Sequence, residues 1–414
     1  MKRVMFYCQH LLGMGHLIRS TEIVRAMSRD FKVLFVVGGE IPEGYRFPEN
    51  IDVLELIPLK SSPDFSDLLL CDFSWDIYET KAMRCNRLLR AFDEFQPDVL
   101  VTELFPFGRK QFSFELLPLL ARAHGRNGKT MIVASLRDIL VRRKDQQEYE
   151  ERVCKVVNTY YDLILVHGDE RLQTLEETFS RVADLECQLA YTGYVVPKRK
   201  DAASREAVRP EQNRKPTIIV SNGSGMCPSG HRLLKSVLQT ASVVEKQLPH
   251  DFHIFAGPLM PENVYKAFQQ TAEQSPNVML SRYTPDLSTL LRQADLSISM
   301  AGYNTVMDVL STGVRALVYP VTGNGDDEQY VRATKLGDKG VLRVVGENQL
   351  QPETLAQEIR SALGWRPYRL PFNDAGAQTS SILLKRFLEM RSNVLSESAG
   401  VSKIGALCAL ASAY

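Results

Sequence analysis

Strand-like apolar runs alternate with amphipathic, helix-length segments along almost the whole chain. The first series covers residues 4–8, 33–38, 53–57, 99–102, 131–135 and 163–166, and the second covers 217–221, 252–256, 278–280, 296–300, 315–319 and 341–344. Several runs are continuously apolar, which is typical of strands buried on both faces of a parallel sheet. The pattern predicts an α/β fold with two doubly wound, Rossmann-like domains.

The chain divides between these two series. At 414 residues it is longer than one hydrophobic core usually holds. A polar, basic stretch without apolar periodicity separates the series, and a Ser-, Ala- and Gly-rich segment ends the chain. The predicted parts are an N-terminal domain at 1–193, a linker or exposed loop at 194–215, a C-terminal domain at 216–391 closed by a helix at 376–390, and a poorly ordered tail at 392–414.

Composition excludes several classes of function. The chain has 50 Lys and Arg against 49 Asp and Glu, so its net charge of +1 gives no reason to expect a nucleic acid partner. Its seven cysteines include no Cys-x-x-Cys pair, which favours a reducing compartment without structural zinc. No run of about 18 apolar residues is present, and the N-terminal apolar run is too short for a signal peptide. We expect a cytoplasmic protein.

The most informative segment for function is the βαβ unit at residues 296–329. A strand runs into Ala301-Gly302, and the helix that follows carries Thr305 and Asp308 one turn apart. Ligands of parallel sheets sit at the carboxyl ends of the strands, where a carboxylate accepts the hydroxyls of a ribose. We predict a nucleotide-sugar pocket here, with Asp308 on the ribose; the alternative for Asp308 is an ordinary surface acid.

An acid-amide cluster follows the second strand of this unit. Asp326 is interpreted as a helix cap, while Glu328 and Gln329 are assigned to sugar hydroxyls, which need paired donors and acceptors. The adjacent carboxylates of Asp326 and Asp327 are also candidates for a metal-binding site. Adjacent carboxylates on a helix point in different directions, and no His or Cys joins them, so no metal site is predicted.

A glycine turn also joins the first strand to the first helix. Gly13 and Gly15 allow backbone N–H groups to approach an anion, and His16 and Arg19 follow on one helix face. The helix N-terminus and the guanidinium disfavour a protonated His16, which leaves its imidazole available as a general base. The alternative is a helix cap in a tight turn. Ile18 occupies the third glycine position of the dinucleotide fingerprint, which disfavours nicotinamide binding.

The second domain opens with a similar turn. Asn222-Gly223-Ser224-Gly225 follows a strand and precedes a helix, which forms a nest of backbone donors suited to a diphosphate. The turn lacks the lysine of a Walker phosphate loop. A glycine turn needed only for chain reversal is the alternative.

Polar residues at other strand ends of the first domain are candidates for acceptor binding. They include Glu103, Arg137 and Asp138. The basic residues at 142–144 are suited to an anionic acceptor or lipid head groups, although a solvated helix face is the favoured explanation. The aromatic stretch at 65–78 is either an acceptor-binding flap or a buried cluster.

Together, these motifs resemble the GT-B glycosyltransferases of the family 28 type. The best-known member of that family adds N-acetylglucosamine to a lipid-linked muramyl peptide in bacterial cell-wall synthesis. The resemblance covers both domains and is strongest over residues 280–346. It implies two facing Rossmann-like domains with a cleft between them, the acceptor in the N-terminal one and a UDP-sugar in the C-terminal one. It also implies a metal-independent, inverting transfer without a cofactor.

The residue patterns and the resemblance together assign roles to individual positions. Catalytic roles fall to His16 and Asp138 as alternative bases. The acceptor side comprises Gly13, Gly15, Arg19, Glu103 and Arg137. Tyr283 falls where the family places the uracil, and Gly302 approaches the diphosphate. The donor side comprises Ser221, Asn222, Gly223, Ser224, Gly225, Tyr283, Ala301, Gly302, Asn304, Thr305, Asp308, Glu328 and Gln329.

Two departures from the family concern the acceptor and the ribose. The family usually has Glu where this chain has Asp308, and its cell-wall members carry a longer first glycine turn. The pieces LLGMGHLIRS, TELFPFGRKQFSFELLPLL and SLRDIL resemble a little-characterised bacterial subgroup of predicted glycosyltransferases. The donor class is therefore expected to match the family. The acceptor stays open between a lipid-linked molecule and a saccharide. Peripheral association with the inner membrane stays open as well.

Other functions of the same architecture remain as alternatives. The motif Gly-x-Gly-His-x-x-Arg also resembles the UDP-sugar hydrolase of pseudaminic acid biosynthesis, in which water replaces the acceptor. UDP-sugar 2-epimerases share the architecture as well. A nucleotide-sugar-binding protein without catalytic activity is the third alternative.

Overall fold

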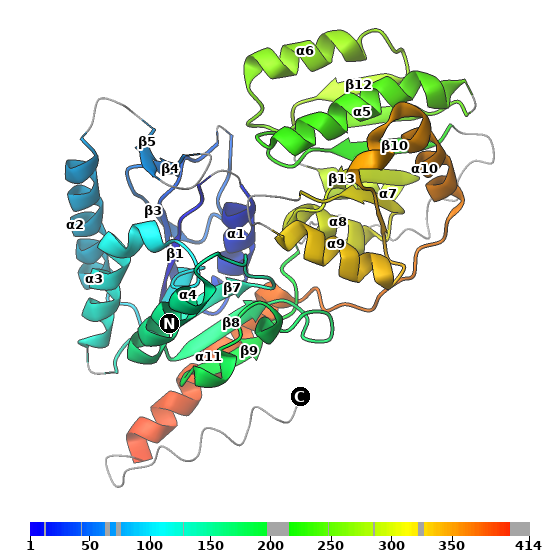
Figure 1. Cartoon of the computed structure of the whole chain (residues 1–414). Coiled ribbons are helices and arrows are strands. Elements are labelled where there is room, and N and C mark those ends of the chain that lie inside the picture. The colour runs from blue at the N-terminus through cyan, green and yellow to red at the C-terminus, as the bar shows by residue number, and fades with distance from the viewer. Residues whose placement is uncertain are drawn as a thin grey trace.

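Each half of the chain forms a parallel β-sheet that helices cover on both faces (Figure 1). The computed structural model describes residues 1–11, 14–42, 44–62, 67–71, 76–126, 128–196, 215–246, 248–284, 286–321 and 327–397. The predicted α/β fold with two doubly wound domains is confirmed.

The N-terminal sheet has the strand order β3-β2-β1-β6-β7-β8-β9 within the described residues. Residues of β1 alternate between two cores: Met5 and Tyr7 pack on one face, and Val4, Phe6 and Cys8 on the other. Burial on both faces explains why the run is continuously apolar. The strands are β1 (Arg3–Cys8), β2 (Lys32–Val37), β3 (Asp52–Glu55), β6 (Val99–Glu103), β7 (Met131–Arg137), β8 (Leu163–His167) and β9 (Gln188–Tyr191).

Helices α1 to α4 and a small hairpin also belong to this part of the described chain. The hairpin pairs β4 with β5 in antiparallel fashion. Asp76 caps α2 by accepting hydrogen bonds from the backbone N–H groups of Tyr78 and Glu79. The elements are α1 (Gly15–Met27), α2 (Ile77–Phe95), α3 (Ser113–His124), α4 (Gln146–Tyr160), β4 (Leu59–Ser61) and β5 (Leu68–Leu70).

The C-terminal sheet has the order β12-β11-β10-β13-β14-β15 in the described residues. Gly313 ends α8 with a left-handed backbone, φ 62°, which a glycine adopts without strain. The strands are β10 (Thr217–Ser221), β11 (Asp251–Phe255), β12 (Val278–Ser281), β13 (Leu296–Met300), β14 (Ala316–Tyr319) and β15 (Arg343–Val344). The helices are α5 (Pro228–Glu245), α6 (Glu262–Ala272), α7 (Leu287–Gln293), α8 (Tyr303–Thr312), α9 (Glu328–Asp338), α10 (Pro352–Gly364) and α11 (Gly376–Glu397).

Both sheets change winding direction at their centre. In the first sheet β1 lies between β2 and β6, and in the second β10 lies between β11 and β13. Ligands of open α/β sheets bind at such switch points, outside the carboxyl ends of the strands. The two glycine turns follow β1 and β10, so both turns lie at a switch point.

The closing helix corrects the predicted domain boundaries. Helix α11 packs against α1, and its Ala377 and Leu384 belong to an N-terminal core cluster (Figure 1). Ser381 donates a hydrogen bond to Asp30 at 2.9 Å. Residues 376–391 therefore belong to the first domain, because their apolar stripe is buried there. The helix also continues to Glu397, beyond the predicted start of the tail; residues 398–414 lie outside the described residues.

The predicted linker begins later than expected. Tyr194, Val195 and Val196 are buried, and Val195 forms a β-bridge with Ala375. These residues therefore belong to the packed joint between the domains. The rest of the predicted loop, residues 197–214, lies outside the described residues.

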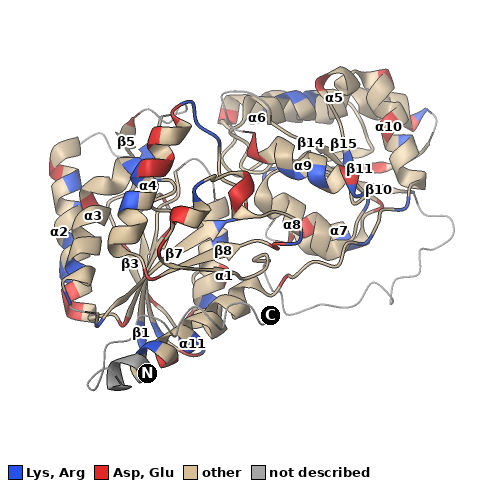
Figure 2. Ribbon diagram, turned by 60° about the horizontal axis from the view of Figure 1, so that its bottom comes forward, with Lys and Arg blue, Asp and Glu red and all other residues tan. Residues whose placement is uncertain are grey.

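Charged residues of both signs are mixed over the helices of both domains (Figure 2). This mixture of signs agrees with the net charge of +1.

Candidate functional site

A cavity of about 480 Å³ lies between the two domains, at the carboxyl ends of strands from both sheets. Most of the predicted site residues line it. On the first-domain side these are Gly15, His16, Arg19 and Arg137. On the second-domain side they are Ser221, Asn222, Gly223, Ser224, Tyr283, Gly302, Asn304, Thr305, Asp308, Glu328 and Gln329.

Four predicted residues do not line this cavity. Glu103, Asp138 and Ala301 are fully or almost fully buried behind its walls. Gly225 has a left-handed backbone, φ 85°, and a Cβ there would meet the Ala256 carbonyl oxygen at 2.7 Å. Its role is therefore a close backbone packing that only glycine permits. The predicted acceptor residue Gly13 and the predicted cap Asp326 lie outside the described residues.

His16 stands on a buried carboxylate. Its Nδ1 lies 2.6 Å from Glu103 Oε1, and Arg19 Nη2 donates to the same oxygen at 2.5 Å. Glu103 ends β6, next to β1, so the switch point itself brings the pair together. The imidazole remains about one-fifth exposed, while Glu103 is completely buried. The arrangement is a base oriented by an acid, as in hydrolytic triads.

The charge state of this pair follows from its surroundings. Burial alone would raise the pKa of Glu103, but the His16 imidazole and the guanidinium groups of Arg19 and Arg109 hold it well below its ordinary value. Burial, and secondarily the Arg109 and Arg19 guanidinium groups, lower the pKa of His16 to about 4, although Glu103 opposes this. Glu103 is therefore ionised and His16 neutral near pH 7.

This charge state selects one tautomer of His16. An ionised carboxylate only accepts hydrogen bonds, so the proton of the neutral imidazole must lie on Nδ1 and be donated to Glu103. The other ring nitrogen, Nε2, then carries the lone pair. This geometry is compatible with His16 as a general base, which stays a prediction, and it places Glu103 beneath His16 as an orienting carboxylate.

The second-domain wall is made of helix N-termini and small residues. Helix α8 begins at Tyr303, with Gly302 as its N-cap, and a Cβ at Gly302 would meet no atom within 4 Å. The first N–H groups of a helix have no partner within it, so they attract anions. The side chain of Asn222 lies so close to helix α5 that a Cβ at Gly230 of that helix would fall 1.6 Å from Asn222 Oδ1.

The remaining donor-side residues extend this wall. Asp308 lies in the second turn of α8 and lines the cavity, as a ribose ligand requires. Tyr283 is 52% exposed in the loop after β12. The preceding residue, Arg282, donates to the Met260 carbonyl at 2.9 Å and lies over the Tyr265 ring at 4.1 Å, which anchors the loop. The backbone that carries the Tyr283 ring is therefore held in place by the contacts of Arg282.

A buried ionic network joins the two domains beside the cavity. Glu328, at the start of α9, pairs with Arg137 of the first domain at 2.6 Å and with Arg332 of its own helix at 2.7 Å. Arg332 also pairs with Asp138 of the first domain at 2.9 Å. All four side chains are at most 17% exposed. The network holds the first-domain strand end β7 against α9.

This network corrects one catalytic prediction. Both oxygens of Asp138 contact Arg332, and Asp138 does not line the cavity, so its carboxylate is not placed to take a proton from an acceptor. The prediction failed because the partner lies 194 residues away in the sequence. Arg332 itself was missed. Its spacing of four residues from Glu328 was the available signal.

The same network changes the meaning of two further predictions. Glu328 and Arg137 line the cavity as predicted, but each already binds the other. Glu328 is therefore first an interdomain contact, and any sugar hydroxyl must share its oxygens with two guanidinium groups. Gln329 also lines the cavity, and its Oε1 accepts from the Val321 backbone N–H at 3.4 Å.

Tyr303 is a further cavity residue that sequence reasoning missed. Its ring is almost fully buried, with the guanidinium groups of Arg19 and Arg332 at 5.3 Å and 5.4 Å from its centroid. In the sequence, a tyrosine that follows a glycine at a helix start is indistinguishable from an ordinary core residue. Its contacts depend on the docking of two domains, which no local pattern reveals.

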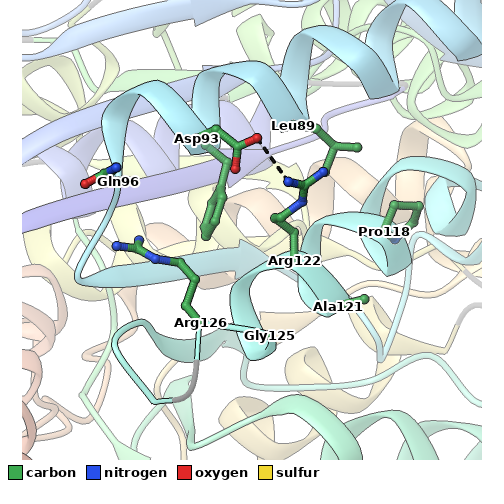
Figure 3. Close-up of a pocket in the computed structure, with 9 residues that line it drawn as sticks. Leu89, Asp93, Gln96, Pro118, Ala121, Arg122, Gly125 and Arg126 are labelled. Atoms are coloured by element: carbon green, nitrogen blue, oxygen red, sulfur yellow. Dashed lines mark hydrogen bonds and ion pairs between the residues drawn. The ribbon is translucent and has the colours of Figure 1, made fainter.

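A separate hollow of about 580 Å³ lies between α2 and α3 (Figure 3). Arg122 pairs with Asp93 across it at 3.3 Å, and Arg126 lies over the Phe92 ring at 5.7 Å. None of the predicted site residues lines it. Residues 142–144, the basic segment, are exposed and likewise do not line the interdomain cavity. Within the aromatic stretch at 65–78, residues 65, 66 and 72–75 lie outside the described residues.

The described residues contain no group of three or more His, Cys, Asp or Glu side chains arranged to hold a metal ion. Among the helices described here, none is both long enough and apolar enough to span a membrane.

Comparison with known proteins identifies the class. Residues 229–380 match the glycosyltransferase family 28 C-terminal domain. Acinetobacter baumannii MurG superposes with a TM-score of 0.54 at 15% identity, covering 95% of this chain and all of that chain. The UDP-GlcNAc 2-epimerase of Methanocaldococcus jannaschii superposes with a TM-score of 0.57 at 11% identity, covering 94% and 100%. The chain thus has the GT-B fold, as the sequence predicted, and residues 229–380 in its second half match the family 28 C-terminal domain.

Two curated relatives narrow this class. An uncharacterized glycosyltransferase of Methanosarcina mazei is 22% identical over 383 residues, 89% of this chain and 92% of that protein. The UDP-N-acetylglucosamine–N-acetylmuramyl-(pentapeptide) pyrophosphoryl-undecaprenol N-acetylglucosamine transferase of Phenylobacterium zucineum is 28% identical over 172 residues, 41% of this chain. That match spans only 45% of the transferase. These matches support the predicted enzyme class, a glycosyltransferase of EC 2.4.

Proposed function

We propose that this protein is a metal-independent, inverting glycosyltransferase that moves a sugar from a UDP-linked donor to a hydroxyl acceptor. The observation that carries the proposal is the interdomain cavity, with a neutral His16 on one wall and the N-terminus of α8 on the other. A base and an anion site that face each other across one cavity suit attack by an acceptor hydroxyl on a nucleotide-sugar.

The proposed chemistry uses both walls in one displacement. The acceptor O–H gives its proton to His16 Nε2 as its oxygen forms a bond to the anomeric carbon. The bond from that carbon to the diphosphate oxygen breaks on the opposite face, so the configuration inverts and UDP leaves. Glu103 stabilises the imidazolium that forms, and the N–H groups at the start of α8 stabilise the departing charge.

The substrates are proposed from the printed names of the relatives. The Phenylobacterium enzyme is named for a UDP-N-acetylglucosamine donor and a pyrophosphoryl-undecaprenol acceptor. We propose a UDP-sugar as donor and keep both a lipid-linked acceptor and a saccharide as acceptor classes. Action at the cytoplasmic face of a membrane, by peripheral association, belongs to the same proposal.

A thermal-shift screen of UDP-, GDP- and dTDP-sugars tests the donor. A ligand that binds the folded state raises its stability by RT ln(1 + [L]/Kd), about 2.7 kcal/mol at 100 times Kd. A UDP-sugar is expected to give the largest shift and to keep it in the presence of EDTA. A chain that responds to none of the nucleotide sugars, or only when divalent metal is present, contradicts the proposal.

A second candidate function is that of a hydrolase or 2-epimerase of the same fold. The likeness to the epimerase structure favours it. Incubation with UDP-N-acetylglucosamine and no acceptor separates the reactions. A transferase leaves the donor intact, a hydrolase releases free sugar in stoichiometric amounts, and an epimerase returns an isomeric nucleotide sugar. A binding protein without activity gives a thermal shift but no turnover with any acceptor, whether or not His16 is present.

A further inference from the structure

Tyr303 joins the proposed donor site to the first domain. It is the first residue of α8 and lines the cavity. Its hydroxyl donates to the His167 carbonyl at 3.2 Å and accepts from the Val195 backbone N–H at 3.2 Å. The N-terminus of the second-domain helix is therefore fastened to the end of β8 in the first domain.

The Tyr303 ring also faces the guanidinium group of Arg19. The Arg19 Cζ lies 5.3 Å from the ring centroid, within the range of a cation–π contact. Arg19 Nη2 donates to Glu103 at 2.5 Å and lies 3.2 Å from His16 Nδ1, but the buried Nε of Arg19 has no hydrogen-bond partner among the described residues. Both contacts are made by the same nitrogen, so they leave the guanidinium free to tilt about it. The aromatic ring is what restricts its plane.

We propose that Tyr303 is a positioning residue that connects the donor helix to the catalytic base through Arg19 and Glu103. The chain of contacts runs from the α8 N-terminus through the Tyr303 ring to Arg19, from Arg19 to Glu103, and from Glu103 to His16. The proposal rests on the proposed function only where it calls His16 a base. The contacts themselves predict a measurable effect on His16 without any substrate.

The direction of that effect follows from the groups around His16. Those with charge or a titratable proton are Cys8 on β1, Arg19 on α1, Glu103 on β6, Arg109 after β6, Arg137 on β7 and Glu328 on α9. Burial and the Arg19 charge both lower the pKa of His16. Removing the Tyr303 ring admits water and frees Arg19 to move away. Both changes raise the pKa of His16.

Histidine titration by NMR on Tyr303→Leu tests the proposal. The chain has seven histidines, and the His16 signal is assigned by its loss in His16→Gln. The pKa of His16, about 4 in the parent protein, is expected to rise by roughly one unit or more. Tyr303→Phe keeps the ring and is expected to keep the parent value, which makes it the rescuing conservative variant.

Tyr194→Leu is the matched control. Tyr194 is a buried tyrosine of the same core cluster, with its ring centroid 6.0 Å from that of Tyr303. Its removal is expected to lower the melting temperature comparably while leaving the pKa of His16 unchanged. If Tyr194→Leu and Tyr303→Leu shift the pKa equally, or if neither shifts it, the proposal is wrong. Tyr303→Met, which fills more of the space, replaces Tyr303→Leu if the latter does not fold.

Transfer assays give a second reading once a substrate pair is known. Tyr303→Leu is expected to lose roughly 10- to 100-fold in kcat, with its acidic limb moved to higher pH, because a small misplacement near a base is costly. The melting-temperature shift caused by UDP reports donor binding separately. A protein that UDP does not stabilise overturns the proposed function, while the NMR titration still decides the role of Tyr303.

Discussion

The two walls of the cavity use the same structural position for different purposes. On the first-domain wall, the residues at the switch point are buried charged side chains, with Glu103 and Arg19 at 0% and 3% exposure beneath His16. On the second-domain wall, the residues at the switch point are small, and a Cβ at Gly223 would have open space around it. In the proposed function, the first wall takes up a proton and the second wall holds an anion.

This difference between the walls shows that the fold determines where each turn lies but not which residues surround it. Both turns follow the central strand of a doubly wound sheet, and both open a helix toward the cavity. What separates them is the neighbouring strand end. Strand β6 ends in Glu103, whereas β13 ends in Met300, so only the first helix start has a carboxylate beneath it. Changing one residue on each wall therefore tests each function separately.

The largest expected effect comes from His16→Gln on the first wall. Glutamine cannot take up the acceptor proton, so kcat is expected to fall by roughly 100- to 10,000-fold. UDP affinity, which belongs to the second wall, is expected to stay within about twofold. The measurement is transfer rate beside UDP-induced thermal shift; a variant that loses UDP binding as strongly as turnover contradicts the division between the walls.

The same variant carries a pH signature in stability. The folded-state pKa of His16, about 4, is below its ordinary value, so the unfolded chain binds more protons between about pH 6.5 and that value. The parent protein therefore loses stability as pH falls through this window. His16→Gln removes that contribution, and its unfolding free energy in urea is expected to depend less on pH there.

Glu103→Gln is expected to have the next largest effect. It leaves the buried Arg19 without its carboxylate, which costs about 3 kcal/mol of stability at neutral pH. It also no longer orients or stabilises the His16 imidazolium, and kcat is expected to fall on the order of 100-fold.

The pH dependence checks the cause of that loss. The pKa of Glu103 is held well below its ordinary value, so its stabilisation is present above about pH 4.3 and is lost as pH falls toward the folded-state value. Urea unfolding at pH 7 and at pH 3.5 measures this. The gap between Glu103→Gln and the parent is expected to shrink at pH 3.5; a constant gap points to packing instead of charge.

The sequence predicted the local features of both walls but not their connections. Alternating apolar runs indicate the strands, and a glycine turn after a strand indicates a helix start that ligands approach. His16 and Asp308 were found in this way, because each lies within one turn or two of such a start. The likeness to family 28 was needed to place them in one cavity.

The remaining contacts depend on how distant elements dock. Asp138 looks like a free strand-end acid in the sequence, and only the docked α9 shows that Arg332 occupies it. Tyr303 looks like core for the same reason, and α11 crosses to the first domain because its apolar stripe fits α1. These are tertiary pairings between residues that are far apart in the chain, and hydrophobic periodicity carries no information about them.

On the second wall, Asp308→Ala is expected to weaken donor binding while changing the rate of transfer from a bound donor little. A carboxylate hydrogen bond to a ligand contributes about 2 kcal/mol, so UDP affinity should fall roughly 30-fold. Comparing UDP with 2′-deoxy-UDP sharpens the assignment. The parent is expected to prefer UDP, and the variant to discriminate less; an unchanged preference contradicts the ribose role. Asp308→Asn, which keeps the shape, should lie between them.

The smallest effect is expected from Tyr283→Ala, at the rim of the second wall. Tyr283 is already 52% exposed, so its removal should change the unfolding free energy by less than about 0.5 kcal/mol. A ring that packs on uracil contributes about 1 kcal/mol, which predicts roughly fivefold weaker UDP binding. Tyr368→Ala is the control, because Tyr368 is similarly exposed, at 57%, and lies outside the cavity. Since both variants lose an exposed ring, a difference in UDP affinity between them isolates the contact with the base, and equal affinities remove Tyr283 from the donor site.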